Sequence, residues 1–441
     1  MTSAVLREQP QARSTAERAY DLLLGGFLYY TFIGLHPLAD GTASSRVDGS
    51  PIDRFVVLSL FGLALFVLWN NAQRALTCLI GNPGQIALVG FAVLSLFWSD
   101  YPDLTLRRAL LFVFLTTITL AIVAGVDDLR RFHSFLFIAL LLIVVANFAV
   151  VALMPSRAIS DIGVNGLYGQ KNLAGIVAMI AALIGFGWLL GAESARSVAL
   201  GACALLLIFA FLVLTRSKTS INLTVLGVMM MGFFALAERF GHRFILASIS
   251  LALLVAAALL LVLAAVDFDF TALLNAVVTD ATFTGRDQLW AFAGAEAHKR
   301  YWFGHGYGAF WDVGYSNDPI LRVETGTWLA TTGVGVINQA HNGYLELWLE
   351  LGLPASIVAG LTTFKGALVG GYRAVFGVGS RQDRAAIGAF AVLLLLQLVH
   401  NQTEATLFIR AMAYSSVASL ALFAMALPQK RFMSSPQRKT R

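Results

Sequence analysis

Charged residues are scarce in this chain. Asp, Glu, Lys and Arg make up 13% of its 441 residues, whereas hydrophobic residues make up 58%. Soluble domains carry about 25% charged residues, and disordered chains contain few apolar residues. The composition therefore excludes both classes and predicts one polytopic membrane unit rather than a series of soluble domains.

Cysteines and several catalytic motifs are also scarce or missing. The two cysteines, Cys78 and Cys203, lie in or beside apolar segments, so we expect packing roles rather than a disulfide or a metal site. The sequence contains neither a glycine-rich loop followed by Lys-Ser or Lys-Thr nor a Gly-x-Ser-x-Gly turn. ATP hydrolysis and serine-hydrolase chemistry are therefore not supported.

One three-residue pattern suggests a metal, but only weakly. Asp267-Phe268-Asp269 has the Asp-x-Asp spacing of many sugar-nucleotide transferases. It stands at the end of an apolar segment that we place on the extracytoplasmic side, where sugar nucleotides are absent. We interpret the triplet as a capping or interface element, and we predict no metal and no cofactor.

Long apolar runs fill most of the chain, and about twelve of them approach the length that a bilayer-spanning helix requires. They are centred on residues 20–38, 54–70, 84–98, 109–125, 135–154, 173–190, 198–214, 221–237, 244–266, 343–363, 385–400 and 405–426. The expected fold is an all-α polytopic membrane protein with one large loop. Its expected parts are a leader at 1–19, nine spans within 20–266, the loop at 267–342, three spans within 343–426 and a basic tail at 427–441.

The basic residues indicate which side of the membrane each loop faces. If the N-terminus is cytoplasmic, the segments on that side hold 18 of the 31 Lys and Arg residues, and the short outer loops hold eight. The positive-inside rule then favours two cytoplasmic termini. We then expect the large loop on the outer side of the membrane, which in a Gram-negative cell is the periplasm. Because the net charge of +6 is spread over loops, we expect a lipid bilayer and no nucleic acid as a partner.

With this topology, five polar segments face the same side and can converge on one cavity. They are the links with Lys171 and Arg216, the large loop with Arg286, the start of the tenth span with His341, and the link with His400 and Glu404.

The cationic candidates are Arg216 and Lys218, in a link between two spans, and Arg286, at the start of a predicted helix over 286–300. Guanidinium groups present forked donors that match the oxygens of a diphosphate. Interfacial anchoring to lipid phosphates is an equally simple role for Arg216 and a simpler one for Lys218. In the predicted helix, Leu289 and Ala293 share the apolar face and Glu296 points to the other face.

Histidines supply the candidates for proton transfer. His341, which Asn342 follows, lies in an apolar setting and could accept a proton from a sugar hydroxyl, or it could only satisfy a backbone carbonyl. His305, in a glycine-rich turn, and Asn342 are further candidates for substrate binding, and a solvated position is an equally simple interpretation of His305. His400 and Glu404 are four residues apart, so on a helix they would share a face and either bind a polar ligand or pair with each other.

Four motifs together resemble those of the O-antigen ligase and O-antigen polymerase superfamily. They are Thr284-Gly285-Arg286-Asp287-Gln288-Leu289-Trp290, Phe303-Gly304-His305-Gly306-Tyr307-Gly308-Ala309-Phe310, Ala340-His341-Asn342-Gly343-Tyr344-Leu345-Glu346 and Glu350-Leu351-Gly352-Leu353. The order of the motifs is more specific than any one of them. The late run His400-Asn401-Gln402-Thr403-Glu404 is similar to that of exopolysaccharide polymerases in the superfamily.

The resemblance implies a membrane-embedded glycosyltransferase of the C type that uses no metal. Its donor would be a glycan on undecaprenyl diphosphate, held by residues that match Arg216 and Arg286, and its acceptor a glycan or a lipid-linked glycan activated by His341. Lys171 and Asn172 have only a loose counterpart. A polymerase of exopolysaccharide or O-antigen repeat units and a ligase acting on lipid A core or protein differ in their acceptor. Other polysaccharide assembly proteins are possible partners.

A transporter or flippase is the alternative from another class, since about a dozen spans fit that function too. A transporter should carry ionisable residues within its spans. Arg410 is the main charge that the sequence places there. The clustering of polar residues on one side favours chemistry at the membrane surface.

Overall fold

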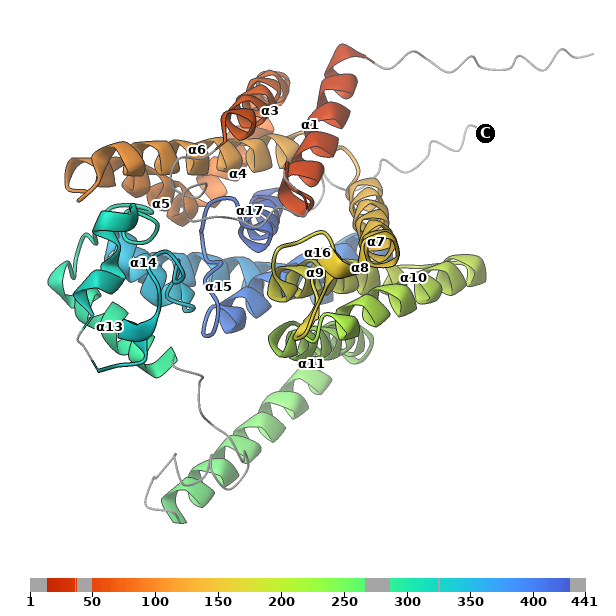
Figure 1. Cartoon of the computed structure of the whole chain (residues 1–441). Coiled ribbons are helices and arrows are strands. Elements are labelled where there is room, and N and C mark those ends of the chain that lie inside the picture. The colour runs from red at the N-terminus through yellow and green to blue at the C-terminus, as the bar shows by residue number, and fades with distance from the viewer. Residues whose placement is uncertain (1–13, 36, 38–49, 266–285, 324–325, 429–441) are drawn as a thin grey trace, which may run out of the picture.

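The computed structural model describes residues 14–35, 37, 50–265, 286–323 and 326–428. These residues form a bundle of α-helices, with a two-stranded antiparallel hairpin of β1 (Ile159–Ser160) and β2 (Gly163–Val164) (Figure 1). The predicted leader lies largely outside them, and the basic tail and the Asp267-Phe268-Asp269 triplet also lie outside them. The longer helices are α1 (Thr15–Phe32), α3 (Pro51–Asn70), α4 (Ala72–Gly81), α5 (Pro83–Leu94), α6 (Pro102–Ala124), α7 (Leu129–Leu153), α9 (Lys171–Leu190), α10 (Ala195–Leu214), α11 (Lys218–Ala265), α13 (Arg286–Lys299), α14 (Gly343–Leu351), α15 (Leu353–Phe376), α16 (Arg381–His400) and α17 (Ala413–Ala426).

Eight helices in the described part of the chain are long and apolar enough to cross a membrane. They are α3, α6, α7, α9, α10, α11, α15 and α16, and a bent pair formed by α4 and α5 raises the number to nine. The protein is thus a multi-pass helical membrane protein, but the count of twelve spans is not confirmed. Helix α1 covers most of the predicted first span. Its 18 residues include Glu17, Arg18 and Asp21, and charges are costly in hydrocarbon.

The first departure from the predicted layout is at residues 71–83, which we expected to be a cytoplasmic link. They contain helix α4, which is bent by 88° from the helical segment Pro83–Phe97. Pro83 stands at the first position of α5 and cannot continue the preceding helix. The predicted span 84–98 is therefore one arm of a broken span or re-entrant segment.

The second departure concerns residues 343–363, which we expected to be one span. The chain breaks at Gly352, whose φ of +86° is accessible mainly to glycine. A Cβ there would also approach the carbonyl oxygen of Trp302 to 2.1 Å. The short helix α14 thus precedes the break, and the membrane-spanning helix α15 follows it.

Two further predicted spans differ in shape. Residues 221–237 and 244–266 are arms of one helical element, α11, which bends at Gly241, where φ is +65°. Beyond the bend, α11 projects away from the other helices (Figure 1). The predicted last span, 405–426, contains only the 14-residue helix α17, because residues 401–412 are turns.

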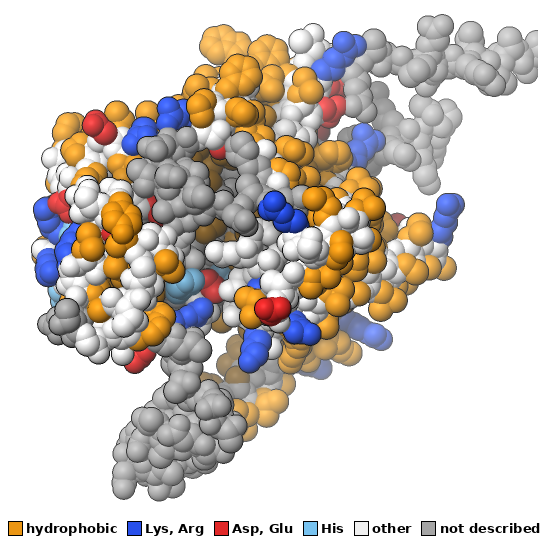
Figure 2. Space-filling model, in the orientation of Figure 1, with side chains coloured by type: hydrophobic (Ala, Val, Ile, Leu, Met, Phe, Trp, Pro, Cys, Tyr) orange, Lys and Arg blue, Asp and Glu red, His pale blue; other side chains and the backbone are white. Residues whose placement is uncertain are grey.

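Helices α9 and α16 form the centre of the bundle. In each of these two helices, 72% of an 18-residue apolar stretch is buried inside the protein, compared with 22% in the peripheral helix α3. Small residues allow the close packing: a Cβ on Gly187 of α9 would lie 2.8 Å from the Cβ of Ala389 in α16. Hydrophobic side chains cover the outer surfaces of the peripheral helices, as a lipid environment requires (Figure 2). Residues on α9 and α16 are therefore held in fixed positions.

The described part of the predicted large loop is folded. Residues 286–323 and 326–351 form a separate layer, named here the α13–α14 layer, against one end of the bundle (Figure 1). The layer has its own apolar core, made up of Leu289, Ala293, Ala297, Phe310, Trp311, Ile320, Leu329, Ala340 and Leu349. The helix predicted over 286–300 is confirmed as α13, but Glu296 is buried, contrary to our assignment of its face. Its carboxylate accepts bonds from Lys299 and Arg322.

Arg108 of α6 joins this layer to the bundle. Its guanidinium group donates to the backbone carbonyls of Gly308, Trp311 and Asp312. The Trp98 indole, at the end of the α5 segment, donates to the Phe303 carbonyl at 2.8 Å. These hydrogen bonds from side chains of the bundle to backbone carbonyls of the layer fix the layer against the end of the bundle.

Candidate functional site

The carboxylate of Glu404 brings together two residues that are far apart in the sequence. Its Oε2 lies 3.1 Å from Nδ1 of His341, and its Oε1 lies 3.4 Å from Nη2 of Arg286. Nη1 of Arg286 also donates to the carbonyl of Thr403 at 2.7 Å. The structure thus places the candidate base and one candidate diphosphate ligand side by side, each on one oxygen of the same carboxylate.

The ends of helices position these three groups. Arg286 is the first residue of α13, His341 lies two residues before the first residue of α14, and Glu404 lies in the turn after α16. Asn342 is the N-cap of α14, because its Oδ1 accepts bonds from the amides of Tyr344 and Leu345. This side-chain oxygen of Asn342, a candidate substrate ligand, is therefore used in fixing the turn beside His341.

The charges around Glu404 determine its ionisation. Burial raises the pKa of Glu404, but the hydrogen bond and charge of His341 and the charge of Arg286 outweigh burial, so the pKa is lower than for an ordinary carboxyl group. Glu404 is thus ionised at neutral pH, and its Oε2 accepts a hydrogen bond from Nδ1–H of His341. With Nδ1 as the donor, the neutral form of the imidazole carries its lone pair on Nε2, which can accept a proton.

Asn172 extends this cluster toward the link between α10 and α11. Its Nδ2 donates to Glu404 Oε1 at 3.4 Å, and its Oδ1 accepts from Ser217 Oγ at 3.4 Å. Ser217 lies between the exposed residues Arg216 and Lys218. The cluster therefore fixes the backbone of the link that carries Arg216, while the side chains of Arg216 and Lys218 face outward.

Lys171 is held nearby, at the start of α9. Its Nζ donates to the carbonyl of Ile162, next to the β1–β2 hairpin, at 3.0 Å. Since Lys171 and Asn172 are adjacent, the predicted convergence of the Lys171, Arg216, Arg286, His341 and Glu404 segments is what the structure shows. Their roles toward a substrate stay predictions.

His305 is buried, so a solvated position is wrong for it. Its Nδ1 lies 2.7 Å from Asp100 Oδ2, and its Nε2 lies 3.3 Å from the carbonyl of Glu296. Both ring nitrogens thus have protein partners, which support the contact between the α13–α14 layer and the segment after α5.

His400 is also buried and does not form the ion pair with Glu404 that the sequence left open. Its Nδ1 lies 3.2 Å from Thr406 Oγ1. Helix α16 ends at His400, so the four-residue spacing no longer places the two side chains on one helical face. The chain turns there and directs Glu404 toward His341 instead.

The sequence analysis did not predict a second charged cluster, which consists of Glu346 and Glu350 of α14 and Arg410. Oε2 of Glu346 accepts bonds from the amide of Ala340 and the indole of Trp311, at 2.7 and 3.2 Å. Glu350, four residues later, lies 4.0 Å from Arg410. Two acidic residues four apart in an apolar segment were the available signal, because buried carboxylates need partners.

The backbone of the site is strained at two candidate residues. His341 has a φ of +49° and Arg216 a φ of +51°. Residues other than glycine seldom adopt this region, although asparagine, aspartate and histidine do so more often than the others, and strained positions are concentrated at functional sites. The buried amide contact from Ala340 to Glu346 holds the turn that leads to His341.

On the face in Figure 2, acidic, basic and histidine side chains lie in a hollow between the α13–α14 layer and the bundle. The arrangement offers a cation, a polarised imidazole and an ionised carboxylate at one end of the spanning helices. This set can bind an anionic group and remove a proton from a neighbouring hydroxyl.

The comparison with protein families agrees with the sequence motifs. Residues 202–360 match the family model described as O-Antigen ligase. The matched region contains Arg216, Arg286 and His341 and ends before Glu404. No curated protein matches the chain. The family match confirms, over residues 202–360, the resemblance to the O-antigen ligase and O-antigen polymerase superfamily.

Proposed function

We propose that the protein is a membrane glycosyltransferase that transfers a glycan from undecaprenyl diphosphate to a hydroxyl group of an acceptor sugar. The observation that carries this proposal is the shared contact of Arg286 and His341 with Glu404. The family match supports the same chemistry, because the matched residues 202–360 include both side chains.

Arg286 and Arg216 hold the donor diphosphate in this proposal. The described contacts of Arg286 use two of the five N–H donors of a guanidinium group, so donors remain for phosphate oxygens. Arg216 is exposed on a link whose backbone is fixed by Asn172 and Ser217. Fixed cations stabilise the charge that develops on a leaving diphosphate, which removes the need for a metal ion.

His341 acts as the general base. Its Nε2 takes the proton of the acceptor hydroxyl while Glu404 holds the Nδ1 proton. The acceptor oxygen forms a bond to the anomeric carbon, the bond from that carbon to the phosphate oxygen breaks, and undecaprenyl diphosphate leaves with the electron pair. Attack opposite to the leaving group inverts the anomeric configuration.

The acceptor in this proposal is a second lipid-linked glycan, so the protein polymerises repeat units of exopolysaccharide or O-antigen. A ligase that moves a finished glycan to lipid A core or protein is the second candidate, favoured by the description of the matched family as a ligase. The donor chemistry is common to both.

The site faces the periplasm of a bacterial inner membrane in this proposal, with both termini in the cytoplasm. The distribution of Lys and Arg over the loops supports this orientation.

Purified protein supplied with undecaprenyl-diphosphate-linked oligosaccharide tests the reaction. We expect release of undecaprenyl diphosphate by the wild type and its loss in His341→Ala. The matched control is His298→Ala, since His298 is an exposed histidine on α13. Movement of the oligosaccharide across the membrane without bond cleavage would contradict the proposal and favour a transporter.

Glycan analysis of a deletion strain separates the two candidates. Single repeat units on the surface glycan identify a missing polymerase. Accumulated lipid-linked polymer identifies a missing ligase.

A further inference from the structure

A polar cavity of about 350 Å³ lies at the end of the bundle opposite Glu404. It is formed where α7, α10 and α16 begin and α9 ends. Helix α9 has 20 residues and starts beside the site, at Lys171, so the cavity lies about 30 Å from the site along the helix. The residues that line it include Arg130, His133, Ser134, Glu193, Ser194 and Ser197.

His133, which lines the cavity, has a ring nitrogen that makes no hydrogen bond to the described residues. The side chain is 3% exposed, and its ring packs edge-on against Phe390. One ring nitrogen bonds to the backbone of Ile184, while Nε2 has no hydrogen-bond partner among the described residues. Because Nδ1 donates to a carbonyl, Nε2 of the neutral ring is an acceptor. A buried acceptor without a donor is costly, and a ligand that donates a hydrogen bond removes this cost.

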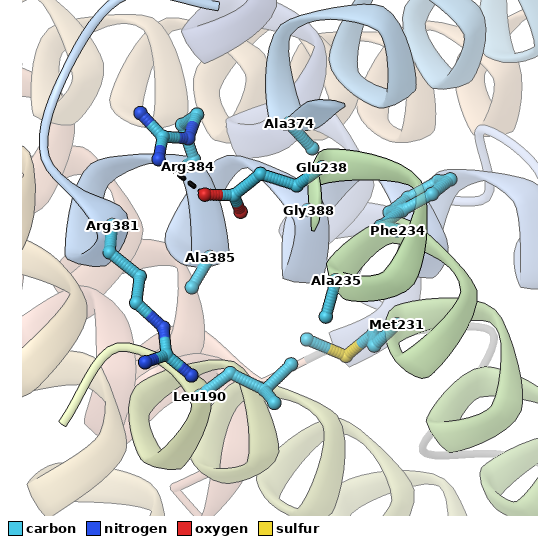
Figure 3. A pocket seen from close by; sticks show the side chains of 10 residues that line it. All are labelled: Leu190, Met231, Phe234, Ala235, Glu238, Ala374, Arg381, Arg384, Ala385 and Gly388. Carbon is cyan, nitrogen blue, oxygen red and sulfur yellow. Dashed lines mark hydrogen bonds and ion pairs between the residues drawn. The ribbon is translucent and has the colours of Figure 1, made fainter. Parts of the chain in front are cut away.

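Other groups around the cavity favour an anion. Arg130 contributes a guanidinium group, whose Nε lies 3.8 Å from carboxylate oxygens of Asp128 and Asp383, and Ser134, Ser194 and Ser197 contribute hydroxyls. Three helices begin at this cavity, with side-chain caps from Asp128, Ser194 and Ser380, and the N-terminal end of a helix carries a partial positive charge. Figure 3 shows a neighbouring pocket, in which Arg381 extends from the start of α16 toward Leu190, while Arg384 pairs with Glu238.

The geometry points to a binding site for a phosphate ester that carries a hydroxyl or ammonium donor beside its phosphate. The phosphate contacts Arg130 and the serine hydroxyls, and the donor reaches Nε2 of His133. Glu193, also in the lining, accommodates the positive charge of an ammonium group. Because the cavity lies where spanning helices end, the ligand is either a soluble phosphate ester or the headgroup of a phospholipid. The site is separate from the proposed transfer reaction.

Binding to the full-length protein in nanodiscs tests this inference. The soluble arm titrates glycerol 3-phosphate by calorimetry. The lipid arm counts bound lipid by native mass spectrometry, comparing phosphatidylethanolamine, which has an ammonium donor, with phosphatidylcholine, which has none. Binding in the first arm identifies a soluble ester, and binding of phosphatidylethanolamine alone identifies a headgroup.

The variants are Arg130→Gln and His133→Phe, and each should weaken binding about tenfold or more. His133→Phe keeps the aromatic contact with Phe390 and removes the unpaired nitrogen, so it should fold even if Arg130→Gln does not. Arg131→Gln is the matched control, because the Arg131 side chain is 91% exposed. Equal binding by wild type, His133→Phe and Arg131→Gln, or no binding of either probe to wild type, would overturn the inference.

Discussion

Nδ1 of His341 lies 3.1 Å from Oε2 of Glu404, and this contact joins two residues that are 63 positions apart in the sequence. The carboxylate has Arg286 on its other oxygen. Its lowered pKa keeps it ionised at neutral pH, so it orients the imidazole and fixes the proton on Nδ1. A neutral amide in its place would lose both the charge and one acceptor.

Glu404→Gln should therefore slow glycan transfer by about a hundredfold or more, as expected when a general base loses its orienting partner. The measurement is the release of undecaprenyl diphosphate by purified variants. Asp161→Asn, the same kind of change at an exposed residue, serves as the control. Wild-type rates in Glu404→Gln would show that His341 does not depend on this carboxylate.

Arg286→Lys should lose activity by about a hundredfold to a thousandfold, the range seen when a donor to developing negative charge is removed. One lysine ammonium cannot reproduce the forked contacts with Thr403 and Glu404 and still face a diphosphate. Arg300→Lys, an exposed arginine paired with Asp100, should keep its activity in the same assay. Full activity in Arg286→Lys would remove the guanidinium from the mechanism.

Substitutions at Arg216 and Lys218 can distinguish a role in substrate binding from a role in membrane anchoring. Both side chains are exposed, but only Arg216 has a left-handed backbone, with a φ of +51°. If Arg216 binds the diphosphate, Arg216→Gln should raise the KM for the lipid-linked donor about tenfold, while Lys218→Gln changes it little. Similar small effects of both changes would identify both residues as interfacial anchors.

The sequence predicted the convergence of the site because it depends only on which end of each span a residue occupies. Lys171, Arg216, Arg286, His341 and Glu404 all belong to segments on the same side. The pairing within the cluster could not be predicted. Glu404 would face His400 if α16 continued, and only the end of the helix at His400 turns it toward His341.

The sequence did not predict helix boundaries at positions where the chain stays apolar on both sides of a break in the helix. Residues 343–363 are apolar throughout, so hydropathy does not reveal the positive φ at Gly352 that separates α14 from α15. The 88° bend after α4 had a local signal, since Asn82-Pro83-Gly84 disfavours a continuous helix. The contacts of Arg108 with the α13–α14 layer are long-range and leave no pattern in the sequence.

The buried carboxyl of Glu346 should make stability depend on pH. Burial, followed by the charge of Glu350, raises the pKa of Glu346 to about 8. Between its ordinary pKa of 4.5 and about 8, the folded protein binds more protons at this group than the unfolded chain does, so its contribution to stability falls as pH rises. Arg410, which faces Glu350, limits this effect.

Glu346→Gln should flatten this slope, because glutamine keeps an oxygen for Ala340 and Trp311 but does not ionise. The measurement is the unfolding temperature of wild type and variant in detergent between pH 5 and pH 9. Glu193→Gln, at an exposed carboxylate, should leave the slope unchanged. Parallel curves for wild type and Glu346→Gln would show that Glu346 is already ionised at low pH.

Alanine substitutions at Gly304 and Gly294 test how tightly the backbone of the α13–α14 layer is packed. Gly304 has a φ of +65°, and a Cβ there would lie 2.4 Å from the backbone carbon of Glu350. Gly294 is inside α13, and a Cβ there meets nothing within 4 Å. Gly304→Ala should therefore destabilise the protein by about 1–3 kcal/mol, whereas Gly294→Ala should stabilise it by about 0.5–1 kcal/mol through helix propensity. Thermal unfolding in detergent measures both changes, and equal unfolding temperatures would show that the turn before α14 is not fixed by the close approach of Gly304 to Glu350.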